Sequence, residues 1–187
     1  MRILIASSEA VPYSKTGGLA DVAAALSKAL ARLGHETVLV VPFYPRALPS
    51  GSQTIESTGR WVHVRVGDRT VNGEILEDRT DHPNLRVLLI RQSEFFDRQG
   101  LYCVGDADYA DNCARFVFFS RAVLEAARAL QIRPDIVHAN DWQTGLVPAL
   151  LEIEYRSQAR FVQTASIFTI HNLAFQGNFP RWEMELT

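Results

Sequence analysis

Short apolar runs alternate along the chain with longer segments that have the periodicity of helices. The runs are rich in Val, Ile and Leu, a composition typical of strands that are buried on both faces of a parallel sheet. We expect such strands at residues 3–6, 37–42, 85–90, 135–139 and 161–170.

Three of the intervening segments predict helices. Residues 19–33 place apolar side chains at the spacing of one helix face, residues 109–130 are apolar nearly all round near Phe116, and residues 145–155 follow the fourth strand. The alternation predicts an α/β fold, a doubly wound Rossmann-like sheet whose ligands lie beyond the carboxyl ends of the strands. The expected buried face of the first helix comprises Leu19, Val22, Ala23, Leu26, Ala29, Leu30 and Leu33.

A different periodicity interrupts this pattern between the second and third strands. Residues 61–66 alternate between apolar and polar side chains, and residues 70–77 follow a turn at Gly67 and Asp68. Such alternation predicts an antiparallel β-hairpin with one wet face, inserted into the α/β fold. A loop rich in proline, serine and glycine is expected before it, including Pro45, Pro49, Ser50 and Gly51.

The composition of the 187 residues narrows the class of protein. A hydrophobic fraction of 47% and a charged fraction of 21% are those of a globular protein, and a net charge of −2 argues against a nucleic-acid or anionic-membrane partner. Cys103 and Cys113 form no Cys-x-x-Cys pair, so neither a zinc site nor a disulfide framework is predicted. With no bilayer-length apolar run and no signal peptide after Met1, we expect a cytoplasmic protein. We expect no cofactor.

The loop between the first strand and the first helix suits a phosphate. Gly17 and Gly18 lie where glycine allows close approach of the backbone and positive φ angles, and where a helix N-terminus attracts anions. Lys15 adds a compact ammonium, which suits a crowded diphosphate. The same residues are also consistent with an ordinary turn beside a solvated lysine. Glu9 and Asp21 bracket the loop, and Asp21 is favoured in a first helical turn whatever its function.

Polar residues also follow the last two predicted strands. Asn140 and Asp141 suit a sugar ligand, although an aspartate before a helix is also a common cap. His171 and Asn172 suit a ligand too, or else a structural histidine followed by a turn. Because the carboxyl ends of parallel strands share one edge of a sheet, we expect Lys15, Asp141 and His171 to open onto the same rim.

Four blocks of residues, in the same order along the chain, resemble the bacterial glycogen synthases and plant starch synthases. They are residues 7–9 with 15–22, residues 96–98 with Gly100 and Tyr102, residues 138–142, and residues 169–177. The resemblance implies the N-terminal lobe of a two-domain GT-B glycosyltransferase. It also implies that residues 1–187 are an incomplete N-terminal starch-synthase catalytic domain from which the C-terminal lobe is absent.

The activity implied by the resemblance is transfer of glucose from ADP-glucose to the non-reducing end of an α-1,4-glucan such as glycogen, with retention of configuration and without a metal. Lys15 and the backbone of Gly17 and Gly18 would hold the donor's phosphates, and His171 and Asp141 would position the glucosyl group and the acceptor. The remaining candidate binding residues match the family blocks or flank the loop: Glu9, Asp21, Phe96, Asn140 and Asn172.

Two alternatives stay open at this point. The chain is also consistent with a non-catalytic nucleotide-sugar or glucan-binding module from a truncated gene, or with a related glycosyltransferase that uses another acceptor. The preference for ADP-glucose over UDP-glucose comes from the resemblance alone. Because the family continues beyond position 187, we expect the 187 residues on their own not to catalyse transfer.

Overall fold

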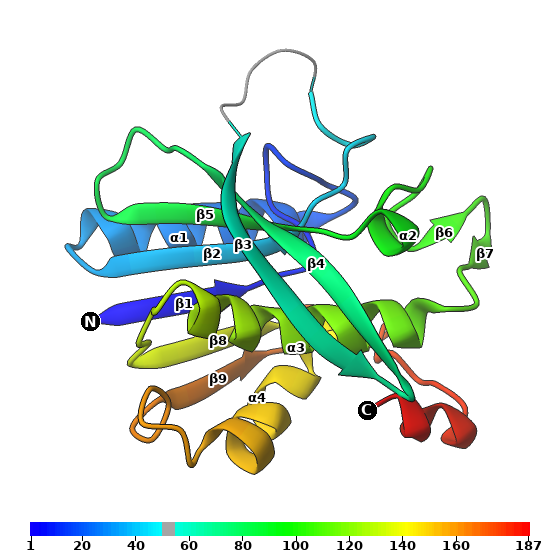
Figure 1. The fold of residues 1–187 in the computed structure, drawn as a ribbon. Helices are drawn as coiled ribbons and strands as arrows, with labels where there is room; N and C mark the ends of the chain where they lie inside the picture. Colours follow the sequence, from blue (N-terminus) through cyan, green and yellow to red (C-terminus); the bar gives the residue numbers. More distant parts are fainter. Residues whose placement is uncertain (50–54) are drawn as a thin grey trace.

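The computed structural model describes residues 1–49 and 55–187, so Ser50 and Gly51 of the predicted loop lie outside the described residues. Within the described residues it contains a seven-stranded sheet in the order β3-β4-β5-β2-β1-β8-β9 (Figure 1). The predicted parallel arrangement of the central strands is confirmed. These strands are β1 (Arg2–Ala6), β2 (Glu36–Pro42), β5 (Leu85–Arg91), β8 (Ile136–Asn140) and β9 (Ala165–Thr169).

The predicted hairpin is confirmed and extends this sheet. β3 (Ile55–Val66) and β4 (Arg69–Asp78) pair antiparallel, and β4 pairs antiparallel with β5. The hairpin crosses in front of α3 (Asn112–Ala129) in Figure 1. Gly73 in β4 permits this close approach, because a Cβ there would lie only 2.8 Å from Cζ of Phe118.

Helices cover both faces of the sheet, as the doubly wound pattern predicts. α1 (Gly18–Arg32) contributes to one hydrophobic core together with Ile3 and Ile5, and α3 contributes to the other together with Leu4 and Ala6. Successive residues of β1 therefore face opposite cores, as the pleat of a strand requires. The expected deep packing of α3 is confirmed, since residues 115–127 are all buried.

The predicted buried face of α1 is wrong in part. Val22 and Leu33 are 45% and 74% exposed. The helix instead turns a face of mostly small side chains to the sheet, which lets the two backbones lie close together. The buried residues of α1 are Leu19, Ala20, Ala23, Ala24, Ser27 and Ala31.

The last predicted strand begins later than expected, while the helix before it is confirmed. Helical structure runs through α4 (Leu146–Leu150) and a π-helical segment, η2 (Leu151–Tyr155). Residues 161–164 then form turns rather than strand, because Thr164 donates its hydroxyl to the carbonyl of Pro134 at 2.7 Å and Phe161 packs on Tyr155. No helix in the described part of the chain combines the length and apolar character of a membrane span.

Candidate functional site

The carboxyl ends of β1, β8 and β9 meet at one edge of the sheet, where the predicted polar residues lie. Asn140, at the end of β8, donates through Nδ2 to the carbonyl of Ala6 at the end of β1, over 3.2 Å. Its Oδ1 lies 3.0 Å from Nε2 of His171, which follows β9. One amide therefore joins the ends of three strands.

Glu9 shapes the loop that leads from β1 into α1. Its side chain is buried, and its carboxylate accepts hydrogen bonds from the backbone N–H and the hydroxyl of Thr16 and from the N–H of Gly17, the last at 3.3 Å. Because these bonds come from the protein itself, Glu9 holds the loop from inside. It therefore helps to form the site rather than to face a ligand.

Gly17 and Gly18 leave open space at the start of α1. Gly17 has an extended backbone with φ −148°, and Gly18 also lacks a positive φ, so the expected use of positive φ angles is wrong. A Cβ added to either glycine would meet nothing within 4 Å, and among the described residues no side chain caps this helix. The missing side chains keep the backbone N–H groups at the helix N-terminus uncovered, which suits an anion.

Lys15 and Asp21 form an ion pair on this open side. Nζ of Lys15 lies 2.8 Å from the Asp21 carboxylate, and both side chains are about half exposed. An exposed pair of this kind contributes only about 0–1 kcal/mol, so an incoming phosphate can compete for the lysine. Asp21 thus orients Lys15 over the loop.

Tyr102 connects Glu9 to a distant part of the chain. Its hydroxyl donates to Oε1 of Glu9 at 2.9 Å, and it lies 2.7 Å from Oγ of Ser8. Burial raises the pKa of Tyr102 well above its usual value, so the phenol keeps its proton for Glu9 and Ser8 must be the donor to the phenol oxygen. The sequence marked Tyr102 only as a member of a family block, and this role in shaping the loop was missed.

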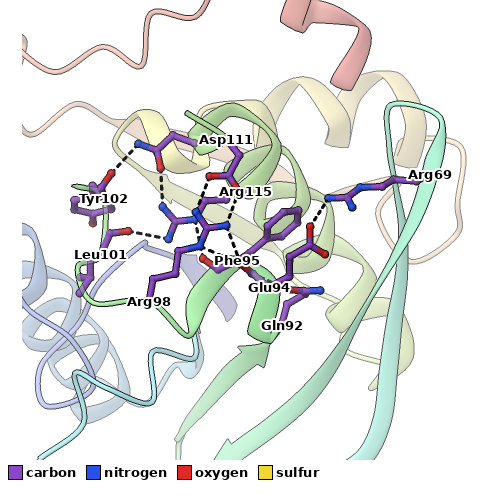
Figure 2. A network of polar contacts seen from close by, with 10 residues as sticks. Arg69, Gln92, Glu94, Phe95, Arg98, Leu101, Tyr102, Asp111 and Arg115 are labelled. Carbon is purple, nitrogen blue, oxygen red and sulfur yellow. Dashed lines mark hydrogen bonds and ion pairs between the residues drawn. The ribbon is translucent and has the colours of Figure 1, made fainter. Parts of the chain in front are cut away.

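Arg115 anchors the segment that carries Tyr102, as Figure 2 shows. This fully buried side chain on α3 donates to the carbonyls of Phe95 and Leu101 and to Oδ1 of Asn112, over 2.6–2.9 Å. Asn112 in turn donates from Nδ2 to the carbonyl of Tyr102 at 3.0 Å. The buried arginine therefore fixes the backbone on both sides of Tyr102, and pattern reasoning alone read it only as part of an apolar helix.

The family block around residues 96–98 is part of the same support. Arg98 pairs with Asp111 at 2.7 Å and stacks on the ring of Tyr109 (Figure 2 shows the ion pair). Gly100 is required by close packing, because a Cβ there would lie 2.1 Å from the carbonyl oxygen of Cys103. These residues fold the loop that presents Tyr102.

Phe96 does not lie at the site. It ends the short helix α2 (Ser93–Phe96), has no exposed surface, and packs edge-on against Tyr44 with ring centroids 5.5 Å apart. Phe118 and Phe119 on α3 complete its surroundings. The expectation that Phe96 contacts a base or sugar is corrected, because its ring belongs to the hydrophobic core.

Asp141 has a backbone conformation that residues other than glycine seldom adopt, with φ 61° and ψ 175°. It precedes the 3₁₀ turn η1 (Trp142–Thr144), but its side chain makes no capping hydrogen bond there. Its Oδ1 instead accepts from the backbone N–H of His171 at 3.0 Å. The capping alternative is therefore wrong, and backbone strain of this kind is concentrated at functional sites in proteins.

Two further polar residues of the same rim have structural partners. His138 in β8 makes a 2.7 Å hydrogen bond between Nε2 and the hydroxyl of Thr169. Burial, and then the neighbouring His171, lower the pKa of His138. Asn172 accepts at Oδ1 from the N–H of Ala174 at 2.9 Å, so it forms a turn that leads away from His171.

A largely apolar pocket of about 580 Å³ lies beside Asp141 and is bordered by α3, η1 and residues 168–187. Gly177, from the last family block, has φ 62°, and a Cβ there would lie 2.5 Å from the ring of Trp142. The described residues bring together no group of three His, Cys, Asp or Glu side chains that could hold a metal ion. The chemistry of the rim is thus an exposed Lys15–Asp21 ion pair, uncovered amides, the carboxylate of Asp141 and the imidazole of His171.

Comparison with known proteins gives consistent matches over nearly the whole chain. The family model of the starch synthase catalytic domain matches residues 2–187. Glycogen synthase of Syntrophotalea carbinolica is 43% identical over 180 residues, which cover 96% of this chain and 37% of the relative. Glycogen synthase of Myxococcus xanthus is 44% identical over 182 residues, which cover 97% of this chain and 37% of the relative.

A solved structure shares the fold. The catalytic domain of starch synthase IV from Arabidopsis thaliana, bound to ADP and acarbose, superposes with a TM-score of 0.85 at 30% identity and covers 98% of this chain. The match spans 36% of that chain. The 187 residues thus span just over a third of the length of these relatives.

Proposed function

This chain belongs to the starch synthase catalytic-domain family, and from that membership we propose that it is the donor-binding part of an ADP-glucose-dependent glucan synthase. Its fold is that of part of the N-terminal lobe of a GT-B glycosyltransferase. The proposed protein transfers glucose from ADP-glucose to the non-reducing end of an α-1,4-glucan such as glycogen, with retention of configuration. Within it, residues 1–187 belong to the N-terminal catalytic domain, and the protein acts in the cytoplasm.

The observation that carries this proposal is the shared rim. The open loop of Lys15, Gly17 and Gly18 leaves the end of β1, and the Asn140 amide connects that strand end to His171. A ligand with a charged group at one end and hydroxyls at the other matches such a rim. A sugar nucleotide has that form, and the Arabidopsis relative was solved with ADP and acarbose bound.

We assign the diphosphate to the glycine loop. The ammonium of Lys15 and the uncovered N–H groups at the start of α1 lie where negative charge grows as the sugar–phosphate bond breaks. Glu9, Tyr102 and Ser8 keep the loop in shape before the substrate arrives, so little reorganisation is needed. Asp21 would release Lys15 to the phosphate.

The glucosyl group is assigned to His171 and Asp141. The bond from C1 of glucose to the ADP oxygen breaks with its electron pair going to ADP. A bond from C1 to the acceptor hydroxyl oxygen forms on the same face, and the hydroxyl proton leaves with the diphosphate. The imidazole and the carboxylate hold the sugar between these two oxygens.

A chimeric enzyme tests the proposal. Residues 2–187 would replace the matching segment of the Myxococcus xanthus glycogen synthase, and incorporation of labelled glucose from ADP-glucose into glycogen would be measured. We expect transfer that falls at least tenfold with Lys15→Ala and persists with Lys28→Ala, a control that removes a lysine of α1 outside the glycine loop. A folded chimera that binds glycogen or ADP but transfers no glucose would favour the non-catalytic module instead.

A further inference from the structure

The side-chain amide of Asn140 can have only one orientation. Asn140 is 1% exposed, and its Nδ2 lies 3.2 Å from the carbonyl oxygen of Ala6 and 3.3 Å from that of His138. Both partners are acceptors, so the group that faces them must be the NH₂. The reversed amide would place Oδ1 against two carbonyl oxygens, where it would find no donor.

This orientation determines where the proton of His171 sits. With the NH₂ directed at the two carbonyls, Oδ1 faces Nε2 of His171 at 3.0 Å. An amide oxygen only accepts hydrogen bonds, so Nε2 must carry the hydrogen. In a neutral imidazole the other ring nitrogen then has a free lone pair, and Nδ1 of His171 has no hydrogen-bond partner among the described residues.

We propose that Asn140 is a positioning residue that keeps a proton on Nε2 of His171, so that in the neutral imidazole Nδ1 accepts a hydrogen bond from a hydroxyl of the bound sugar. The identity of that hydroxyl donor rests on the proposed function, whereas the position of the proton does not. The imidazole thus selects a ligand that donates a hydrogen bond.

The surroundings hold His171 from two sides. The backbone N–H of His171 donates to Oδ1 of Asp141 at 3.0 Å, so the strained residue after β8 fixes the start of the segment. His138 is engaged by the hydroxyl of Thr169 at 2.7 Å and does not compete for the Asn140 oxygen. Asn140 and Asp141, adjacent in sequence, therefore hold the ring and the main chain of one histidine.

Nitrogen-15 NMR of the histidine-labelled 187-residue chain at pH 7.5 tests the position of the proton. His171 is assigned by its loss in His171→Asn. We expect Nε2 to show the shift of a protonated nitrogen, Nδ1 that of an unprotonated one, and the Nε2 proton to exchange slowly with water. A His171 ring protonated on Nδ1 alone would overturn the proposal.

Two substitutions at position 140 separate positioning from general packing. Asn140→Leu removes the acceptor and should abolish the slowly exchanging Nε2 proton. Asn140→Asp keeps an acceptor and should retain it. Thr169→Val, which removes the partner of His138, is the matched control and should leave the His171 signals unchanged. An Nε2 proton that survives in a folded Asn140→Leu chain would contradict the role of Asn140.

The acceptor role of Nδ1 is tested with ADP-glucose in the labelled chimera. Binding should shift the Nδ1 resonance in the direction of an accepted hydrogen bond and leave Nε2 protonated. Transfer of the ring proton to Nδ1 on binding would overturn the acceptor assignment. A chimera that binds no ADP-glucose would count against the proposed function. The position of the proton in the free chain is decided separately, by the spectrum of that chain.

Discussion

A substitution at Gly18 can distinguish an effect on folding from an effect on binding. Its φ is not positive and a Cβ would meet no atom within 4 Å, so nothing in the described chain requires a glycine there. Alanine at this first helical position should leave the free energy of unfolding unchanged or raise it by up to about 1 kcal/mol. The same methyl group would occupy the space assigned to the phosphate.

We therefore expect Gly18→Ala to weaken ADP binding at least tenfold without loss of stability. Urea denaturation and titration calorimetry on the same preparation measure the two quantities. The matched control is Gly34→Ala after α1, where φ is 86° and alanine should lower stability but leave ADP binding alone. If Gly18→Ala binds ADP as tightly as the wild type does, the phosphate does not bind at this loop.

His138 should make stability depend on pH. Burial, and then His171, lower its pKa in the folded chain, so between the folded value and the ordinary value near 6.5 only the unfolded chain binds the proton. Stability from this residue is thus complete above pH 6.5 and is lost as the pH falls below it. Between pH 7.5 and 5.5, urea unfolding should show a smaller decline for His138→Gln than for the wild type. Equal declines would show that His138 does not contribute.

Single residues were predicted best where chemistry follows a strand end. Lys15, Asp141 and His171 were predicted because glycine loops and polar residues after buried strands mark ligand edges in α/β folds, and the structure brings Asp141 and His171 together. The functional roles of all three residues stay predictions. The bonds that organise them could not be predicted. Glu9 and Tyr102 form a hydrogen bond although they are 93 positions apart in the sequence. The capping alternative for Asp141 failed at a residue whose backbone has a positive φ, which the sequence does not reveal.

At the scale of elements, the loop from α2 to α3 supports the glycine loop. Tyr102→Phe removes the hydroxyl that donates to Glu9 and accepts from Ser8, two hydrogen bonds that are partly buried. We expect a loss of about 1–3 kcal/mol in the free energy of unfolding. The carboxylate of Glu9 accepts hydrogen bonds from the N–H groups of Thr16 and Gly17. Hydrogen exchange at these two N–H groups should also become faster.

Tyr109→Phe provides the control for this prediction. Its hydroxyl accepts from the N–H of Gly100 at 3.1 Å in the same loop but has no bond to Glu9. It should therefore lower stability without changing exchange at Thr16 and Gly17. If Tyr102→Phe leaves both amides as protected as in the wild type, the two loops are not coupled through Glu9.

Most elements could be predicted from periodicity, since buried strands and the helix at α3 have unmistakable apolar patterns. The exceptions follow from packing that a pattern does not record. α1 buries mostly small side chains and leaves Val22 exposed, because a close approach to the sheet needs small side chains. The start of β9 depends on a hydroxyl bond to Pro134, a contact across 30 positions.

At the scale of the whole molecule, the order of the family blocks corresponds to the order of structural roles. Residues 7–22 form the loop after β1 and the start of α1, and residues 96–102 support that loop. Residues 138–142 and 169–177 supply His171 and the side chains of Asn140 and Asp141 that contact it. The resemblance pointed to the fold that the comparisons show. It did not reveal that Phe96 lies in the core, because a block records which residues occur and not which way they face.

The central claim is that the glycine loop binds the diphosphate of a nucleotide sugar. It is tested most directly by titrating ADP into the ¹⁵N-labelled 187-residue chain and following the backbone amides. The account predicts shifts concentrated at Gly17, Gly18 and Leu19, which disappear in Lys15→Ala. Shifts that avoid this loop, or that persist unchanged in Lys15→Ala, would contradict it.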